Sequence, residues 1–300
     1  MTKRIALITW AGLPEGTQSE RLLLRCLAAD GVDASMADWR DPAIDFGQFD
    51  LLVLRSCWDY HLQPHEFSAW LGAIAWHVPV LNDIETVLWN SNKFYLRELP
   101  SRQIEIPPTC FVSAGSMVSH VEFAEIESWP GSVVKPAISA SAHKTWLFER
   151  GTLPSPQKLA ALMQGEAYLV QRFIPEIQTA GEISFIYIDG VYSHAMLKQP
   201  APGDFRVQKE FGGCITPFSP PPALLAQSDD IAARVPQVCD SLYCRIDVVE
   251  RNGRLLLMEL ELIEPELFLG LCEGSAARFA QAILRRLANH KNHFAADLHS

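Results

Sequence analysis

The chain has 300 residues, of which 48% are hydrophobic, and this is enough for about two or three domains with packed cores. Its formal net charge of −10 argues against nucleic acid or an anionic membrane surface as the main partner. The seven cysteines are scattered and include no C-x-x-C pair, so they suggest neither a disulfide framework nor a zinc site and favour a reduced, cytoplasmic setting. No apolar run is long enough to span a bilayer, and the opening MTKRIALITWAG is typical of a first β-strand.

The first part of the chain alternates between predicted strands and predicted helices. Strands are expected over 4–11, 33–39, 49–56 and 78–83, and helices over 19–31 and 64–77. This alternation is typical of parallel βα units, so residues 1–88 are predicted to form a doubly wound, Rossmann-like domain. Ligands of such domains usually bind at the carboxyl ends of the strands, where RSCWDYH (55–61) is placed. A loop that only packs its tryptophan is the alternative for this segment.

From NSNKFYLREL onward the sequence changes to strands, hairpins and loops with prolines. One hairpin is predicted over 182–199, turning at Asp189-Gly190, and another over 243–263, turning at Asn252-Gly253. A helix is expected over 275–290. The fold class is therefore α/β (α+β), with residues 89–300 as a second region.

The run RLLLMELELIEPELFL (254–269) carries four acids within an apolar strand pattern. In an extended chain Glu259 and Glu261 lie on one face, so their like charges favour a cation or several donors between them. A solvated strand face is the alternative. Asp247 precedes Glu259 by twelve residues across the hairpin, and the two share a face only with an odd loop or a bulge. We predict a three-residue loop with Gly253 or Arg254 in a left-handed conformation, or an equivalent bulge.

Two lysines stand where an anion would stabilise them. Lys135 ends the apolar strand SVVKPA and is followed by small residues, including Ser139 and Ser141, whose backbone can approach a phosphate closely. Lys93 lies in the first turn of a predicted helix capped by one of residues 90–92, where a cation is electrostatically misplaced unless an anion shares the site. Ordinary solvated lysines are the alternative in both cases.

Further polar groups follow the apolar strand LVQRFI. Gln171 at its end, with Glu176 and Glu182 after it, could offer a hinge to a purine edge and carboxylates to ribose hydroxyls. Solvated acids are the alternative reading. Positive charge is then concentrated at three positions of this otherwise acidic chain, namely Lys198, Arg206 and Arg245.

In this order the motifs resemble those of the ATP-grasp ligases, which include ribosomal-protein glutamate ligases, glutathione synthetases and D-alanine ligases. The matching stretches are NKFYLREL, VVKP, LVQRFI, GEISFIYIDG, GDFRVQKEFGG, CRIDVV and LLLMELE. Within this superfamily, LRSCWDYHLQPHEFSAWL, WNSNKFYLREL and ELELIEPELFL look most like the cyclo-ligases of cycloserine biosynthesis and their relatives. The resemblance implies an ATP-grasp region over 89–300, with a lid at about 100–170 and a C-terminal part at 171–300.

The resemblance also implies roles for individual residues. ATP would be held by Lys93, Lys135, Ser139, Ser141, Gln171, Arg172, Ile174, Glu176 and Glu182. Two Mg²⁺ ions would be held by Asp247, Glu259 and Glu261, and the transferred phosphoryl group would lie near Arg245, Arg206 and Lys198. Two departures stand out: Glu261 replaces a usual asparagine, and Ser184 replaces a frequent arginine.

The expected reaction is ADP-forming ligation through an acyl phosphate on a small amino-acid-like substrate. That substrate is expected to contact Arg55, Ser56, Asp59 and Tyr60. Alternatives are a ligase acting on a protein or peptide tail, a non-catalytic ATP-binding regulatory module, and a Cys57 nucleophile beside His61, which lacks an orienting acid. The resemblance is compatible with a cytoplasmic enzyme and with a homodimer.

Overall fold

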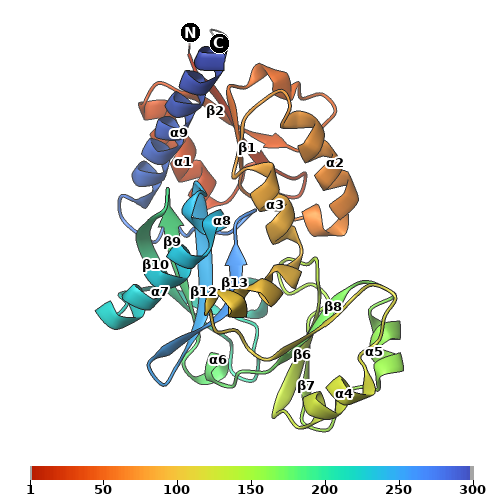
Figure 1. The fold of residues 1–300 in the computed structure, drawn as a ribbon. Helices are drawn as coiled ribbons and strands as arrows, with labels where there is room; N and C mark the ends of the chain where they lie inside the picture. The colour runs from red at the N-terminus through yellow and green to blue at the C-terminus, as the bar shows by residue number, and fades with distance from the viewer. Residues whose placement is uncertain (1, 298–300) are drawn as a thin grey trace.

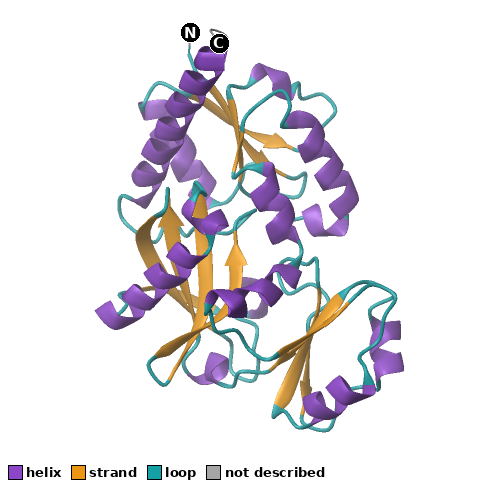
Figure 2. Ribbon diagram, viewed as in Figure 1, coloured by secondary structure: helices purple, strands orange, loops and turns teal. Residues whose placement is uncertain are grey.

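The computed structural model describes residues 2–297 of the chain (Figure 1). Within these residues the strands form three sheets that follow one another along the sequence. The first sheet has four parallel strands, and the other two, with four and five strands, are antiparallel. The predicted mixture of helices and strands is confirmed (Figure 2).

The N-terminal sheet has the order β2-β1-β3-β4 and is covered on both faces. Alternate residues of β1 face opposite sides: Ile5 and Leu7 pack with α1 and α9, whereas Ala6 and Ile8 pack with α2. Figure 1 shows α1 and α9 side by side on one flank and α2 on the other. The elements are β1 (Arg4–Thr9), α1 (Gln18–Ala29), β2 (Asp33–Asp38), β3 (Leu51–Leu54), α2 (Pro64–Ile74), β4 (Val80–Leu81) and α3 (Ile84–Ser91), with short 3₁₀ turns η1 (Phe46–Gln48) and η2 (Tyr60–Leu62).

The second sheet, of order β5-β8-β6-β7, follows the 3₁₀ helix η3 (Lys93–Arg102) and projects from the rest of the molecule (Figure 1). Two helices pack on it, and their core includes Val134, Leu159 and Tyr168. The elements are β5 (Thr109–Val112), α4 (His120–Glu127), β6 (Gly131–Pro136), β7 (Trp146–Glu149), α5 (Pro156–Leu162) and β8 (Tyr168–Arg172). The proposed domain limits within the sequence stay a prediction.

The third sheet, of order β11-β10-β9-β12-β13, contains both predicted hairpins. Asp189-Gly190 and Asn252-Gly253 are two-residue turns in which both residues have positive φ, as a primed hairpin turn requires. Its elements are α6 (Glu176–Thr179), β9 (Glu182–Ile188), β10 (Val191–Gln199), η4 (Lys209–Phe211), β11 (Cys214–Phe218), α7 (Pro222–Arg234), α8 (Pro236–Cys239), β12 (Tyr243–Arg251), β13 (Arg254–Glu261) and α9 (Ser275–Asp297). In the part of the chain that the structure describes, none of the helices combines the length and apolarity that crossing a bilayer requires.

The β12–β13 hairpin contains the bulge that the acids require. Arg251 pairs with Arg254, so the three-residue loop we predicted is wrong. The register instead shifts between Asp247 and Val248, and Asp247 then lies opposite Glu259. The alternative prediction of a bulge is therefore confirmed, and Gly253 is left-handed as expected, with φ of 78°.

A buried amide joins the N-terminal sheet to the third sheet. Asn82, directly after β4, donates from Nδ2 to the carbonyl oxygens of Tyr243 at 2.9 Å and Leu262 at 2.8 Å. Its Oδ1 accepts from the backbone N–H of Leu242 at 2.7 Å. These bonds fix the start of β12 and the end of β13 against the N-terminal sheet, and the candidate site lies beside this junction.

Candidate functional site

A cavity of about 460 Å³ lies where the three sheets meet. Its walls come from the loop after β3, the start of η3, β6 with the loop that follows it, the end of β8, and strands β9, β10, β12 and β13. The predicted site residues that line it are Tyr60, Lys93, Lys135, Ser139, Ser141, Gln171, Arg172, Ile174, Glu182, Lys198, Arg206, Arg245, Asp247, Glu259 and Glu261.

Arg55 lies outside the cavity lining, so its predicted contact with substrate stays a prediction. Its side chain is 1% exposed, and its guanidinium lies 3.2 Å from Glu20 and over the ring of Tyr243. It also donates to the carbonyl oxygen of Pro265 at 2.9 Å. All of these partners are protein groups, so Arg55 fastens β3 to α1 and to the segment after β13.

Three further predicted residues also lie outside the lining. Ser56 is buried and donates to Thr9 Oγ1 at 3.0 Å. Asp59 is buried and accepts from Trp39 Nε1 at 2.9 Å. Glu176 pairs with Arg251 at 3.0 Å. In this structure these groups contact protein partners outside the cavity, so the predicted contacts of Ser56 and Asp59 with substrate and of Glu176 with nucleotide stay predictions.

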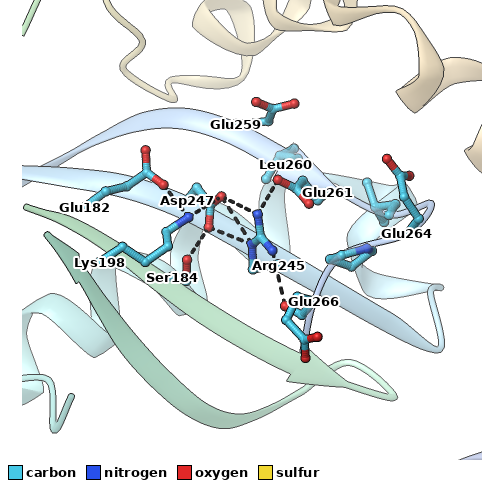
Figure 3. A network of polar contacts seen from close by, with 12 residues as sticks. Glu182, Ser184, Lys198, Arg245, Asp247, Glu259, Leu260, Glu261, Glu264 and Glu266 are labelled. Atoms are coloured by element: carbon cyan, nitrogen blue, oxygen red, sulfur yellow. Dashed lines mark hydrogen bonds and ion pairs between the residues drawn. The ribbon is translucent and has the colours of Figure 1, made fainter. Parts of the chain in front are cut away.

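A network of buried charges forms the floor of the cavity (Figure 3). Lys198 Nζ pairs with Glu182 and lies 3.0 Å from Asp247. The guanidinium of Arg245 lies 2.9 Å from Asp247 and also pairs with Glu261. Burial raises the pKa of Asp247, but the two cations outweigh it and hold that pKa well below its usual range. The network keeps several charges ionised out of water.

The two departures from the family pattern both take part in this network. The Ser184 hydroxyl donates to Asp247 Oδ1 at 2.5 Å, so it adds a donor but no charge. Glu261 lies opposite Arg245 in the strand register and forms the ion pair, which an asparagine could not do.

Lys93 and Lys135 both face the carboxylate of Glu259. Lys93 Nζ lies 2.9 Å from Glu259 Oε1 and donates to the carbonyl oxygen of Ser139 at 2.6 Å. Burial lowers the pKa of Lys135, and the nearby charge of Lys93 lowers it further. The pKa of Glu259 is lowered because both lysines outweigh the effect of its burial. A phosphate group could replace this carboxylate between the lysines.

Within residues 2–297, no three or more His, Cys, Asp or Glu side chains lie together as ready ligands of a metal ion. The expected trio shares the cavity, but Arg245 holds Asp247 and Glu261 while Lys93 holds Glu259. The donor set nevertheless fits Mg²⁺, which prefers carboxylate oxygens. Burial and the neighbouring acids raise the pKa of Glu261 to about 7. The charge of Arg245 opposes this rise but does not cancel it. A divalent cation would supply the missing charge.

One part of the cavity wall is formed by the end of β8 and the loop after β6. Phe173 and Ile174 add apolar surface, and Gln171 Nε2 donates to Thr109 Oγ1 at 3.0 Å. In the other wall, Ser141 and Ala142 have φ of 49° and 55°. Left-handed residues in such a loop turn successive N–H groups toward one side, as in anion-binding nests.

Several cavity residues are not among the predicted site residues. Trp58 and Glu264 both line it, and Trp58 Nε1 donates to the carbonyl oxygen of Glu264 at 3.0 Å. Thr17 and Ser19, at the start of α1, also line it. The T-x-x-E pattern of residues 17–20, a capping box, predicts the start of this helix, but nothing local places it at the cavity.

The architecture matches solved ATP-grasp enzymes. A D-alanine–D-alanine ligase from Bacillus anthracis complexed with ATP is 13% identical, with a TM-score of 0.69 over 97% of this chain and 99% of that one. The ATP-grasp ligase PsnB, complexed with a phosphomimetic variant of its minimal precursor, Mg and ADP, is 14% identical, with a TM-score of 0.65 over 94% and 98%. The predicted ATP-grasp fold is confirmed.

The similarity to another enzyme of this fold, D-cycloserine synthetase DcsG, is greater in both sequence and structure. The family of the D-cycloserine synthetase DcsG N-terminal domain matches residues 5–82. The cycloserine biosynthesis protein DcsG of Streptomyces lavendulae is 28% identical over 94% of this chain and 98% of its own length. The crystal structure of D-cycloserine synthetase DcsG has a TM-score of 0.83 at 27% identity, covering 95% and 99%. The chain is thus similar over nearly its whole length to an ATP-grasp ligase, and the resemblance found in its sequence is confirmed.

Proposed function

We propose that the protein joins a carboxylate to an amine, within one small amino-acid-like molecule or between two, with formation of ADP and phosphate. One observation carries this proposal: Lys93 and Lys135 face the carboxylate of Glu259 in one cavity. Asp247 and Glu261 line the same cavity. Cations for the triphosphate and oxygen ligands for its metal ions are thus present in one place.

In the first step, a carboxylate oxygen of the substrate attacks the γ-phosphorus of ATP, and the bond to the bridging oxygen breaks to release ADP. The amine nitrogen then attacks the acyl carbon, the carbon–oxygen bond to phosphate breaks, and the nitrogen loses a proton. Lys93 and Lys135 would neutralise the phosphates, with Arg245, Arg206 and Lys198 nearer the transferred group. Arg206, held by Asp204 at 2.8 Å, lines the cavity with its planar donor fork fixed.

Asp247, Glu259 and Glu261 are proposed to hold two Mg²⁺ ions, which supply charge neutralisation between the phosphates. Because these carboxylates now contact Arg245 and Lys93, the cations must change partners when Mg-ATP binds. Gln171, Arg172 and Ile174 are proposed to contact the adenine, Ser139 and Ser141 the phosphates, and Glu182 the ribose.

The size of the cavity supports a small substrate over a peptide tail. Tyr60 and Trp58 form its N-terminal wall and are proposed to exclude water from the acyl phosphate. Because the chain is similar to the cycloserine biosynthesis protein DcsG, ring closure within one molecule is the first option to test. Seven free cysteines support a reducing, cytoplasmic location, and a homodimer stays a prediction.

The test is a screen for ADP release over small amino acids and their derivatives, each with and without a second amine. With a true substrate, hydroxylamine should trap a hydroxamate, and the nucleotide product should be ADP. Formation of AMP and pyrophosphate would refute the acyl-phosphate route. ATP binding without turnover of any compound would favour the regulatory module instead.

A further inference from the structure

One acid of the cavity differs from the others in its surroundings. Glu182, Asp247, Glu259 and Glu261 are each paired with a lysine or arginine. Glu266, next to the start of α1, accepts hydrogen bonds from Ser19 and from the backbone N–H of Phe268. Glu210, which also lines the cavity, is exposed, whereas Glu264 is half-buried and its carboxylate has neither an ion pair nor a hydrogen bond in the described part of the chain.

The backbone holds this carboxylate in place. Trp58 Nε1 donates to the carbonyl oxygen of Glu264 at 3.0 Å, and Arg55 Nη2 donates to that of the next residue, Pro265, at 2.9 Å. In Figure 3 the Glu264 side chain points away from Arg245, to the same side as Glu259. A carboxylate without a partner is thus aimed into the cavity from a segment fixed at two consecutive carbonyls.

The neighbours of Glu264 match a cation. Trp58 and Tyr60 line the same part of the cavity, and aromatic faces attract ammonium groups. Burial, and then the charge of Glu261, raises the pKa of Glu264 to about 8, so a bound cation would favour the ionised form of this carboxyl. The charges of Lys93 and Arg245 oppose this rise, but both side chains are paired with other acids of the cavity.

We infer that Glu264 binds the amino group of the substrate as an ammonium ion, between the rings of Trp58 and Tyr60. The inference rests on the proposed function, because it assumes that an amino-acid-like substrate occupies this cavity. The substrate carboxylate would then point toward the lysines and the γ-phosphate while its ammonium group faces Glu264. Glu264 therefore selects substrates that carry an amino group over otherwise identical acids.

The test measures binding of amines by calorimetry to the whole protein saturated with Mg-ADP. The probes are D-alanine, L-alanine, D-serine, L-serine and D-cycloserine, and propionate is the control without an amino group. We expect at least one amine to bind at least about tenfold more tightly than propionate. In Glu264→Gln, that amine should bind at least about tenfold more weakly, while affinity for Mg-ADP changes less than about twofold. Glu127→Gln, an exposed change on α4, is the matched control.

Several results would overturn the inference. These are that no amine binds the wild-type protein, that Glu264→Gln binds amines normally, or that propionate and amine weaken equally. An equal loss of Mg-ADP affinity would assign Glu264 to the metal and would overturn it as well. Failure of the wild-type protein to bind Mg-ADP is a separate result, which would count against the proposed function itself.

Discussion

Lys93 Nζ lies 2.9 Å from Glu259 Oε1, so a predicted phosphate ligand and a predicted metal ligand neutralise each other. Both groups are largely buried, and either one alone would be costly to leave without a partner. Mg-ATP can replace this pair without leaving a buried charge, because the phosphate takes Lys93 as the metal takes Glu259. Metal-free ATP would satisfy only the lysine, which favours joint binding of nucleotide and metal.

Glu259→Ala should therefore abolish turnover and leave the fold intact. Lys93 keeps its bond to the carbonyl oxygen of Ser139, at 2.6 Å, so the cation is not left without an acceptor. We expect ligase activity to fall at least about a hundredfold because a proposed metal ligand is lost. The Mg²⁺ dependence of ADP binding checks the metal site, and circular dichroism checks the fold. Glu127→Gln is the control. Near-normal ATP-dependent activity would show that the metal assignment is wrong.

Glu261→Asn, which introduces the usual residue of the family, should change the pH dependence of Mg²⁺ binding. The pKa of Glu261 is about 7, against an ordinary value of 4.5, so the carboxyl gains a proton as the pH falls below 7. Mg²⁺ needs the ionised form, so its affinity should fall by up to about tenfold per pH unit below 7. Asparagine does not titrate, so this pH dependence of Mg²⁺ affinity should disappear in Glu261→Asn. Calorimetry at pH 6, 7 and 8 with ADP checks it, and identical slopes for both proteins would contradict it.

In the metal-free protein, Glu261→Asn should also change how the free energy of unfolding depends on pH. Between pH 4.5 and 7 the folded protein retains a proton on Glu261 that the unfolded chain has lost. The folded state binds more protons, so the contribution of Glu261 to the free energy of unfolding decreases as the pH rises through this range. Urea unfolding should therefore show a smaller decrease with pH for Glu261→Asn than for the wild type. Parallel curves would contradict the raised pKa.

The sequence predicted the elements better than their mutual contacts. Strong local signals identified both hairpins, since Asp189-Gly190 and Asn252-Gly253 are typical primed turns. The bulge was only one of two options, because the extra residue, Met258, has no signal of its own beside the turn. The acids Glu259 and Glu261 were recognised by their unusual place in an apolar strand. Their pairing with Lys93 and Arg245 depends on register and long-range packing, which spacing cannot give.

Arg55 shows the limit most clearly. A cation after a buried strand of a doubly wound sheet occupies the usual position of a ligand-binding residue. Its actual partner, Glu20, is 35 residues away and forms part of the capping box at the start of α1. That box uses Glu20 Oε2, and Arg55 uses Oε1, so one carboxylate serves both the helix start and the buried ion pair.

Arg55→Ala should consequently reduce stability rather than substrate affinity alone. Glu20 would be left as a buried charge with a single remaining set of donors, and breaking such a pair costs about 3–5 kcal/mol. The double variant with Glu20→Gln should recover part of this loss, because the uncompensated charge is gone. Urea unfolding of the single and double variants measures both effects. A stable Arg55→Ala protein with only a raised Michaelis constant for the substrate would restore Arg55 to the acceptor site.

Trp58→Phe tests whether the loop after β3 contributes to the acceptor side of the cavity. Phenylalanine keeps an aromatic face but cannot donate the 3.0 Å hydrogen bond from Trp58 Nε1 to the carbonyl oxygen of Glu264. Loss of one such bond costs about 1 kcal/mol, and the segment that carries the Glu264 side chain would be less well fixed. The Michaelis constant of the amine-bearing substrate should rise about fivefold, while that of ATP stays within about twofold, because the proposed nucleotide contacts come from β6 and β8. Trp76→Phe, at a tryptophan that is 88% exposed, is the matched control and should change neither constant. An equal rise in both constants for Trp58→Phe would mean that this loop only packs the interface between the sheets.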